Sequence, residues 1–115
     1  MLRLPKALPY PVVMEIALTG DPLSAETAYR HGLVSRLAEP GSALDEARAL
    51  AARILMNGPL AVTATKRIVS ETIGWSDAEG FARQQAIVDP VFSSADAEEG
   101  ALAFVEKRDP VWRGE

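Results

Sequence analysis

SSADAEEGALAFVEKRDPVWRGE, residues 93–115, is the stretch that decides the fold of this chain. Between residues 94 and 108, apolar side chains recur at the i, i+4, i+7 and i+8 spacing of one buried helical face, namely Ala97, Ala101, Phe104 and Val105. Acidic residues fill the first turns and basic residues the last, which complements the helix dipole at both ends. Pro110 cannot continue a helix. The stretch therefore predicts an amphipathic helix that packs on a partner.

Gly100 lies inside this predicted helix. A glycine in a helix interior costs about 1 kcal/mol relative to alanine. We therefore expect another backbone or a ligand to approach position 100 closely, because a solvated helix has no need of a glycine there.

The same residues resemble the C-terminal signature of the enoyl-CoA hydratase/isomerase (crotonase) family. The signature is carried by Glu99-Gly100, Ala103-Phe104, Glu106-Lys107-Arg108, Pro110 and Trp112. Two upstream segments resemble the same family. One is EIALTG at residues 15–20, followed by AETA at 25–28 and GLV at 32–34, and the other is Asn57, Pro59 and Lys66. The motifs stand in the family's order and cover nearly all of the chain.

The resemblance implies a mainly α-helical chain, the helical C-terminal portion of a crotonase-like α/β fold with at most one or two short strands. It implies residues 1–41 as the end of the family's core and 42–115 as a helical trimerisation and lid region. The parent activity is expected to be hydration of an enoyl-CoA thioester, with coenzyme A entering as part of the substrate and no separate cofactor. The intact protein is expected to be a homo-oligomer, a trimer or a dimer of trimers.

The resemblance also suggests a binding site at Phe104 and Lys107. In several family members, the matching phenylalanine and lysine lie beside the adenosine end of coenzyme A. An aromatic face can flank adenine and an ammonium group can pair with phosphate. We expect no catalytic residue in this chain, because the family's two catalytic glutamates and its oxyanion hole belong to an upstream region.

Composition excludes several classes of protein. The chain has 115 residues, 48% of them hydrophobic, with a formal net charge of −4 and no cysteine, which predicts one soluble domain of ordinary composition. Acidic balance and scattered basic residues argue against a nucleic-acid surface. No apolar run approaches the roughly 20 residues that span a bilayer. Proline interrupts the N-terminus, unlike a signal peptide, so we expect a cytoplasmic protein.

Pattern along the chain predicts mostly helices. Residues 12–18 are apolar apart from Glu15, and periodicity does not decide between strand and helix there. Ser24 is expected to cap a short helix closed by Gly32, followed by an extended exit at residues 33–34, and the resemblance implies a last small strand at residues 32–34. From residue 42 we expect four helices joined by short turns, with Ser42 and Ser76 forming capping boxes and Pro90 ending the third.

Other candidate site residues have structural explanations. His31 could act as a general base, but it ends a short helix, where a cation is favoured, and no partner has suitable spacing. Glu15 is a carboxylate in an apolar stretch, yet the resemblance does not match it to a catalytic position. The acidic residues Asp96, Glu98 and Glu99 lack a companion histidine, so we expect no metal site. The alternative function is a non-catalytic helical oligomerisation or interaction module.

Overall fold

The computed structural model describes residues 3–115, and all regular structure in that range is helical. The fold class predicted from the sequence is therefore confirmed. The chain forms two compact units, one ending at Arg48 and the other beginning at Ala49, and each is described by itself. The functional division expected after residue 41 stays a prediction.

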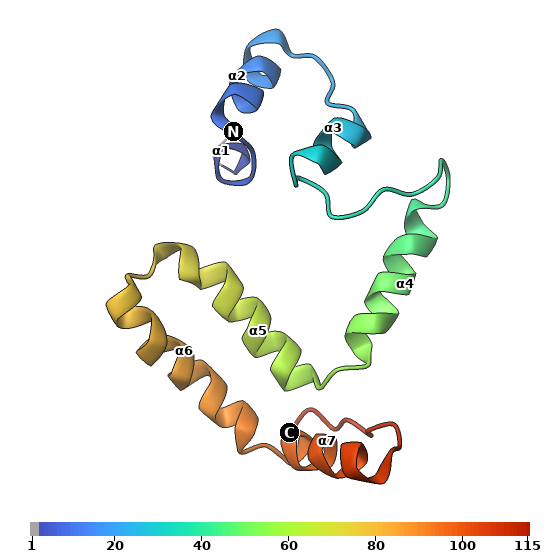
Figure 1. Ribbon diagram of the computed structural model, residues 1–115, viewed down its shortest axis with the longest axis vertical. Helices are drawn as coiled ribbons and strands as arrows, with labels where there is room; N and C mark the ends of the chain where they lie inside the picture. The colour runs from blue at the N-terminus through green and yellow to red at the C-terminus, as the bar shows by residue number, and fades with distance from the viewer. Residues whose placement is uncertain (1–2) are drawn as a thin grey trace. The chain divides into compact units, whose positions relative to one another are not determined.

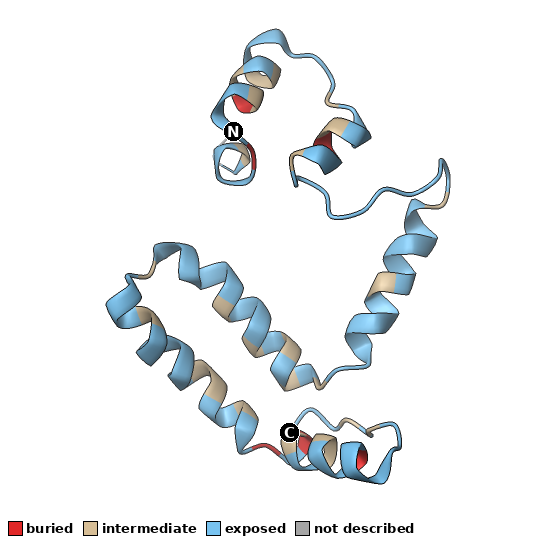
Figure 2. Cartoon of the chain, in the orientation of Figure 1, coloured by how far each residue is buried: buried red, intermediate tan, exposed pale blue. Residues whose placement is uncertain are grey.

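The first unit contains α1 (Leu4–Ala7), α2 (Tyr10–Thr19) and α3 (Ala25–Arg30) (Figure 1). The apolar segment at residues 12–18 is thus helical, because Pro11 starts α2 and Gly20, at φ 73°, ends it. One apolar side chain is buried from each helix or its flank, namely Leu8, Val13 and Ala28 (Figure 2). This small core leaves much of α2 exposed.

The ends of α3 match their predicted chemistry. The Ser24 hydroxyl accepts a hydrogen bond from the Thr27 backbone N–H at 3.1 Å. Gly32 adopts φ 77°, and the next N–H, of Leu33, returns to the Ala28 carbonyl at 2.8 Å. The small strand expected at residues 32–34 is wrong, since these residues form a turn and a bend, and their N–H groups donate to carbonyls of α3 instead of pairing with a strand.

Helix α4 (Ala43–Leu55) begins and ends near its predicted limits. The capping box expected at Ser42 is not what forms, because its hydroxyl donates to the Glu39 carbonyl at 2.8 Å. At the other end, the Asn57 side-chain amide donates to the carbonyls of Arg53 and Ile54, both at 3.1 Å. Asn57 therefore satisfies carbonyl groups that the end of the helix leaves without partners.

Helices α5 (Pro59–Glu71) and α6 (Asp77–Phe92) pack side by side, joined by the short 3-10 helix η1 (Thr72–Gly74) (Figure 1). Ser76 precedes α6, but its hydroxyl donates to the Glu79 carboxylate at 3.2 Å and caps no backbone N–H. The prediction that Pro90 ends α6 is wrong, since the helix continues to Phe92. Proline lacks an N–H, so near the end of a helix it forfeits one hydrogen bond while its φ stays helical.

Helix α7 (Ala95–Glu106) is capped by Ser94, whose hydroxyl accepts from the Ala97 N–H at 3.1 Å. The face predicted to be buried is wrong for this chain: Phe104 and Val105 are each 74% exposed. The buried side chains of α7 are instead Asp96 and Ala103, because the C-terminal segment covers the other side of the helix (Figure 2). Ala97 and Ala101 of the predicted face line a groove with apolar residues of α5 and α6, whereas Phe104 and Val105 stay exposed.

In the part of the chain that is described, no helix is long and apolar enough to cross a membrane.

Candidate functional site

Phe104 and Lys107 meet at the C-terminal end of α7. The Lys107 ammonium nitrogen lies 4.4 Å from the centroid of the Phe104 ring, a cation–π contact on an exposed surface. Lys107 has a left-handed backbone, with φ 57° and ψ 39°. A side chain in that region costs on the order of 1 kcal/mol, and glycine usually occupies such a position. A strained lysine beside an exposed aromatic ring is a candidate binding feature.

Arg108, next to this lysine, is occupied by internal ion pairs. Its guanidinium binds both carboxylate oxygens of Glu99, at 2.6 and 2.9 Å, and one oxygen of Glu106 at 2.6 Å. These partners raise the pKa of Arg108, Glu99 contributing most. By contrast, no carboxylate of residues 3–115 pairs with Lys107. Of the two adjacent cations, Lys107 is therefore the one available to a ligand.

The carboxylate of Glu99 has a second role in fastening the chain. Besides Arg108, it accepts the backbone N–H of Val111 at 2.7 Å. The hydrogen bonds from the Arg108 side chain and then from Val111 lower the pKa of Glu99 to about 2. Arg108 and Val111 thus stabilise the ionised form of Glu99.

Asp96 holds the end of the chain in the same way. It is 4% exposed, and its two carboxylate oxygens accept the backbone N–H groups of Arg113 at 2.7 Å and Gly114 at 2.9 Å. Its own N–H donates to the Glu115 carbonyl at 3.0 Å. From the sequence, Asp96 was expected only to interact favourably with the helix dipole. Its hydrogen bonds to the C-terminal segment are what bury it.

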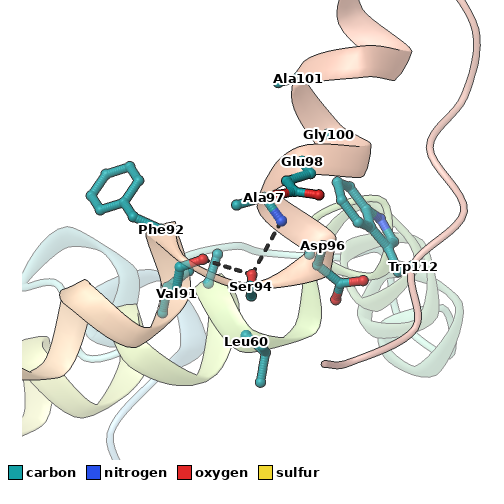
Figure 3. Close-up of a pocket in the computed structure, with 12 residues that line it drawn as sticks. Leu60, Val91, Phe92, Ser94, Asp96, Ala97, Glu98, Gly100, Ala101 and Trp112 are labelled. Carbon is teal, nitrogen blue, oxygen red and sulfur yellow. Dashed lines mark hydrogen bonds between the residues drawn. The ribbon is translucent and has the colours of Figure 1, made fainter.

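Trp112 lies between these fastened residues and packs on two glycines. Its indole N–H donates to the Met56 carbonyl at 3.1 Å. A Cβ atom built on Gly100 would lie 3.2 Å from the ring, and one built on Gly58 would lie 3.6 Å away. The predicted close approach at Gly100 is confirmed, and the group that approaches is the indole ring instead of a backbone or ligand (Figure 3).

A groove of about 580 Å³ opens beside this contact (Figure 3). Its walls come from the start of α5, the end of α6 and the first turns of α7, with Trp112 at one side. They include Leu60, Ala61, Val91, Phe92, Ala97 and Ala101. This mostly apolar lining could contact an apolar group, and it contains few side chains that could take part in acid–base chemistry.

His31 and Glu15, considered separately from the sequence, line one cavity of about 270 Å³ in the first unit. Asp21, Ser24 and Thr27 share its wall. No hydrogen bond or ion pair joins the histidine to the glutamate in residues 3–115. Over the same residues, no group of three or more histidine, aspartate or glutamate side chains lies close enough to hold a metal ion. The cavity therefore lacks an assembled catalytic pair.

Comparison with known proteins assigns the chain to a family. The family model for enoyl-CoA hydratase/isomerase matches residues 1–115. This chain belongs to the enoyl-CoA hydratase/isomerase family. The resemblance seen in the sequence motifs is confirmed.

Solved family members share the whole described fold. An enoyl-CoA hydratase from Mycobacterium tuberculosis H37Rv superposes with a TM-score of 0.95 at 60% identity, over 99% of this chain and 45% of that one. An enoyl-CoA hydratase from Mycobacterium marinum gives a TM-score of 0.94, also at 60% identity and over the same shares of the two chains. The helices thus match the helical C-terminal part of a crotonase fold.

A curated relative is similar over the same extent. A carnitinyl-CoA dehydratase from Salmonella arizonae is 44% identical over 118 aligned residues, which cover 99% of this chain and 45% of that protein. This chain therefore spans less than half the length of the relatives it matches.

Sequence reasoning located the family signature but missed what most of its residues do. Glu99, Arg108 and Trp112 were identified as members of the motif. In the structure, their side chains bind the C-terminal segment to the helices. Nothing in a helix-start aspartate distinguishes the buried Asp96 from an exposed one, because its partners are backbone N–H groups seventeen and eighteen residues away. Gly100 was the one usable signal of close packing.

Proposed function

We propose that this chain is the C-terminal part of a family member that adds water to, or removes it from, a carbon–carbon double bond of an acyl-CoA thioester. The single observation that carries the proposal is the family match over residues 1–115. The names of its relatives support the reaction, since enoyl-CoA hydratase and carnitinyl-CoA dehydratase both denote gain or loss of water on a coenzyme A thioester.

Within that protein, Phe104 and Lys107 are proposed to contact the nucleotide end of coenzyme A. The ring is 74% exposed and presents an aromatic face, and the ammonium group has no carboxylate partner in residues 3–115. Because the ammonium already covers one ring face, an adenine would stack on the opposite face or displace it. Residue 107 is a lysine although a glycine would adopt this left-handed backbone conformation with less strain, which supports a role for the lysine side chain.

Titration of the 115-residue chain with 3′-phosphoadenosine 5′-diphosphate, the nucleotide part of coenzyme A, tests this contact. Lys107→Ala is expected to weaken binding by about tenfold or more, as for a lost charge-assisted hydrogen bond of ~1.5 kcal/mol. Lys6→Ala, at an exposed lysine of α1, is the matched control and should bind like wild type. Equal affinity of both variants would remove Lys107 from the site.

The acid–base chemistry is proposed to belong to a part of the family fold outside these residues. Glu15 is exposed and makes no ion pair in the described range, and Glu99 is held ionised by Arg108. The chain alone is therefore expected not to hydrate crotonyl-CoA, as followed by loss of the enoyl-thioester absorbance. Turnover above background that Glu15→Gln abolishes would overturn this assignment.

The second candidate function is a non-catalytic oligomerisation module, which the exposed apolar face of α7 favours. Leu102, Phe104 and Val105 on that helix are 49%, 74% and 74% exposed. In either case we propose that the protein works as a homo-oligomer, because exposed apolar faces of this kind usually mark interaction surfaces.

A further inference from the structure

The chain reverses direction at Lys107, and residues 108–115, here called the return segment, run back along α7. The Arg108 N–H bonds the Ala103 carbonyl at 3.1 Å, which closes the helix. Val111, Arg113 and Gly114 then donate their N–H groups to carboxylates of α7 in order, first Glu99 and then Asp96. Side chains of α7 thus bind backbone N–H groups along the return segment.

Besides Arg108, whose guanidinium binds Glu99 and Glu106, Trp112 is a residue of the return segment whose side chain is held in place. Its neighbours on both sides are held by carboxylates, and its ring packs between Gly58 and Gly100 with the indole N–H on the Met56 carbonyl. The return segment is therefore fastened at two separate places, to the first turns of α7 and to the turn between α4 and α5.

Lys107 stands at the pivot of this arrangement. In residues 3–115 it is the one non-glycine residue with a positive φ. Such a conformation persists only when surrounding contacts hold it, because an isolated lysine would relax to a right-handed or extended backbone. On one side of it, the Lys107 and Arg108 N–H groups both donate to the Ala103 carbonyl of α7, and on the other side the return segment is bound to the same helix.

From these contacts we infer that Asp96, Glu99 and Trp112 are positioning residues for Lys107. By fastening the return segment along α7, they hold residue 107 in its left-handed conformation, and that conformation sets the ammonium group above the Phe104 ring. The ligand consequence rests on the proposed function, since it assumes that this ammonium group meets a coenzyme A phosphate. The conformational inference does not depend on any ligand.

Nuclear magnetic resonance of the ligand-free 115-residue chain tests the conformational inference. The ε-methylene protons of Lys107 should be shifted upfield by the Phe104 ring current, and Phe104→Leu calibrates that shift by removing it. Asp96→Asn leaves one carbonyl oxygen where two oxygens accept N–H groups, so the upfield shift should be largely lost. Glu98→Gln removes the same charge from an exposed neighbour in the same turns and should keep the shift.

Asp96→Asn is informative only if α7 stays helical, which circular dichroism checks. A chain ending at Pro110 is the second variant, because it deletes only residues outside any helix and leaves every α7 side chain in place. It should lose the shift as well. Retention of the wild-type shift in the shortened chain, or absence of the shift from wild type, would overturn the inference.

Titration with 3′-phosphoadenosine 5′-diphosphate separates this inference from the proposed function. If both hold, Asp96→Asn should weaken binding about tenfold, as Lys107→Ala does, whereas Glu98→Gln should not. If wild type keeps the ring-current shift but binds no nucleotide, the proposed contact fails and the positioning inference stands. If nucleotide binding survives in Asp96→Asn with the shift lost, Lys107 geometry does not control the ligand, and the ligand consequence fails.

Discussion

Replacing Gly100 by leucine tests the most specific packing contact in the chain. A Cβ atom at position 100 would already lie 3.2 Å from Cη2 and 3.4 Å from Cζ3 of Trp112, tighter than most real contacts. A leucine adds three further carbon atoms in the same direction, so the indole ring has to leave its place. Its hydrogen bond to the Met56 carbonyl would be lost with it.

The expected loss of stability is the sum of two destabilising effects and one stabilising effect. Overpacking costs about 1–3 kcal/mol and the lost hydrogen bond about 1 kcal/mol. Leucine regains about 0.8 kcal/mol, because it favours a helix more than glycine does. The free energy of unfolding should therefore fall by about 1–3 kcal/mol, and each kcal/mol lowers Tm by roughly 4–8 °C in a domain of this size.

Thermal unfolding by circular dichroism, at one fixed protein concentration, measures the effect. Trp75→Phe in every variant leaves Trp112 as the single tryptophan, so a red shift of its fluorescence reports release of the ring. Glu98→Leu, on the exposed side of α7, is the control and should change stability by less than about 0.5 kcal/mol. Equal small changes in Tm for both variants, with unaltered Trp112 emission, would refute the packing role of Gly100.

Three further predictions address the neighbouring contacts. Gly58→Ala should leave Tm nearly unchanged, since its Cβ would sit at an ordinary 3.6 Å from Trp112; a loss comparable to Gly100→Leu would contradict this. Glu99→Gln should destabilise the chain at pH 7. Because the pKa of Glu99 is lowered from 4.5 to about 2 on folding, the ionised carboxylate contributes fully to the free energy of unfolding above pH 4.5, and this contribution is lost as pH falls towards 2. The difference in stability between Glu99→Gln and wild type should therefore shrink over that range. Urea unfolding at several pH values measures it, and a pH-independent difference would be contrary evidence. The chain should self-associate through its exposed apolar faces, as sedimentation over a concentration series would detect; a monodisperse monomer that binds no hydrophobic dye would exclude this.

Local chemistry determined where most helices begin and end. Ser24 and Gly32 define α3 through a cap and a left-handed glycine, and Asn57-Gly58-Pro59 separates α4 from α5. These signals act between residues a few positions apart, so they can be read from the sequence. The prediction that Pro90 ends α6 was wrong because a proline can occupy the last turn of a helix, where its missing N–H removes only one hydrogen bond.

Which face of α7 is covered was decided only by the tertiary structure. Periodicity marks a face that is able to be buried, but burial requires a partner, and the partner here is the return segment, through its backbone N–H groups and the Trp112 ring. The roles of Asp96 and Trp112 depend on contacts with residues 17 and 56 positions away, respectively, whose formation no local pattern encodes. The sequence identified the family and flagged Gly100, whereas the ring that fills the space beside it is a property of the folded chain, because only folding brings Trp112 to that glycine.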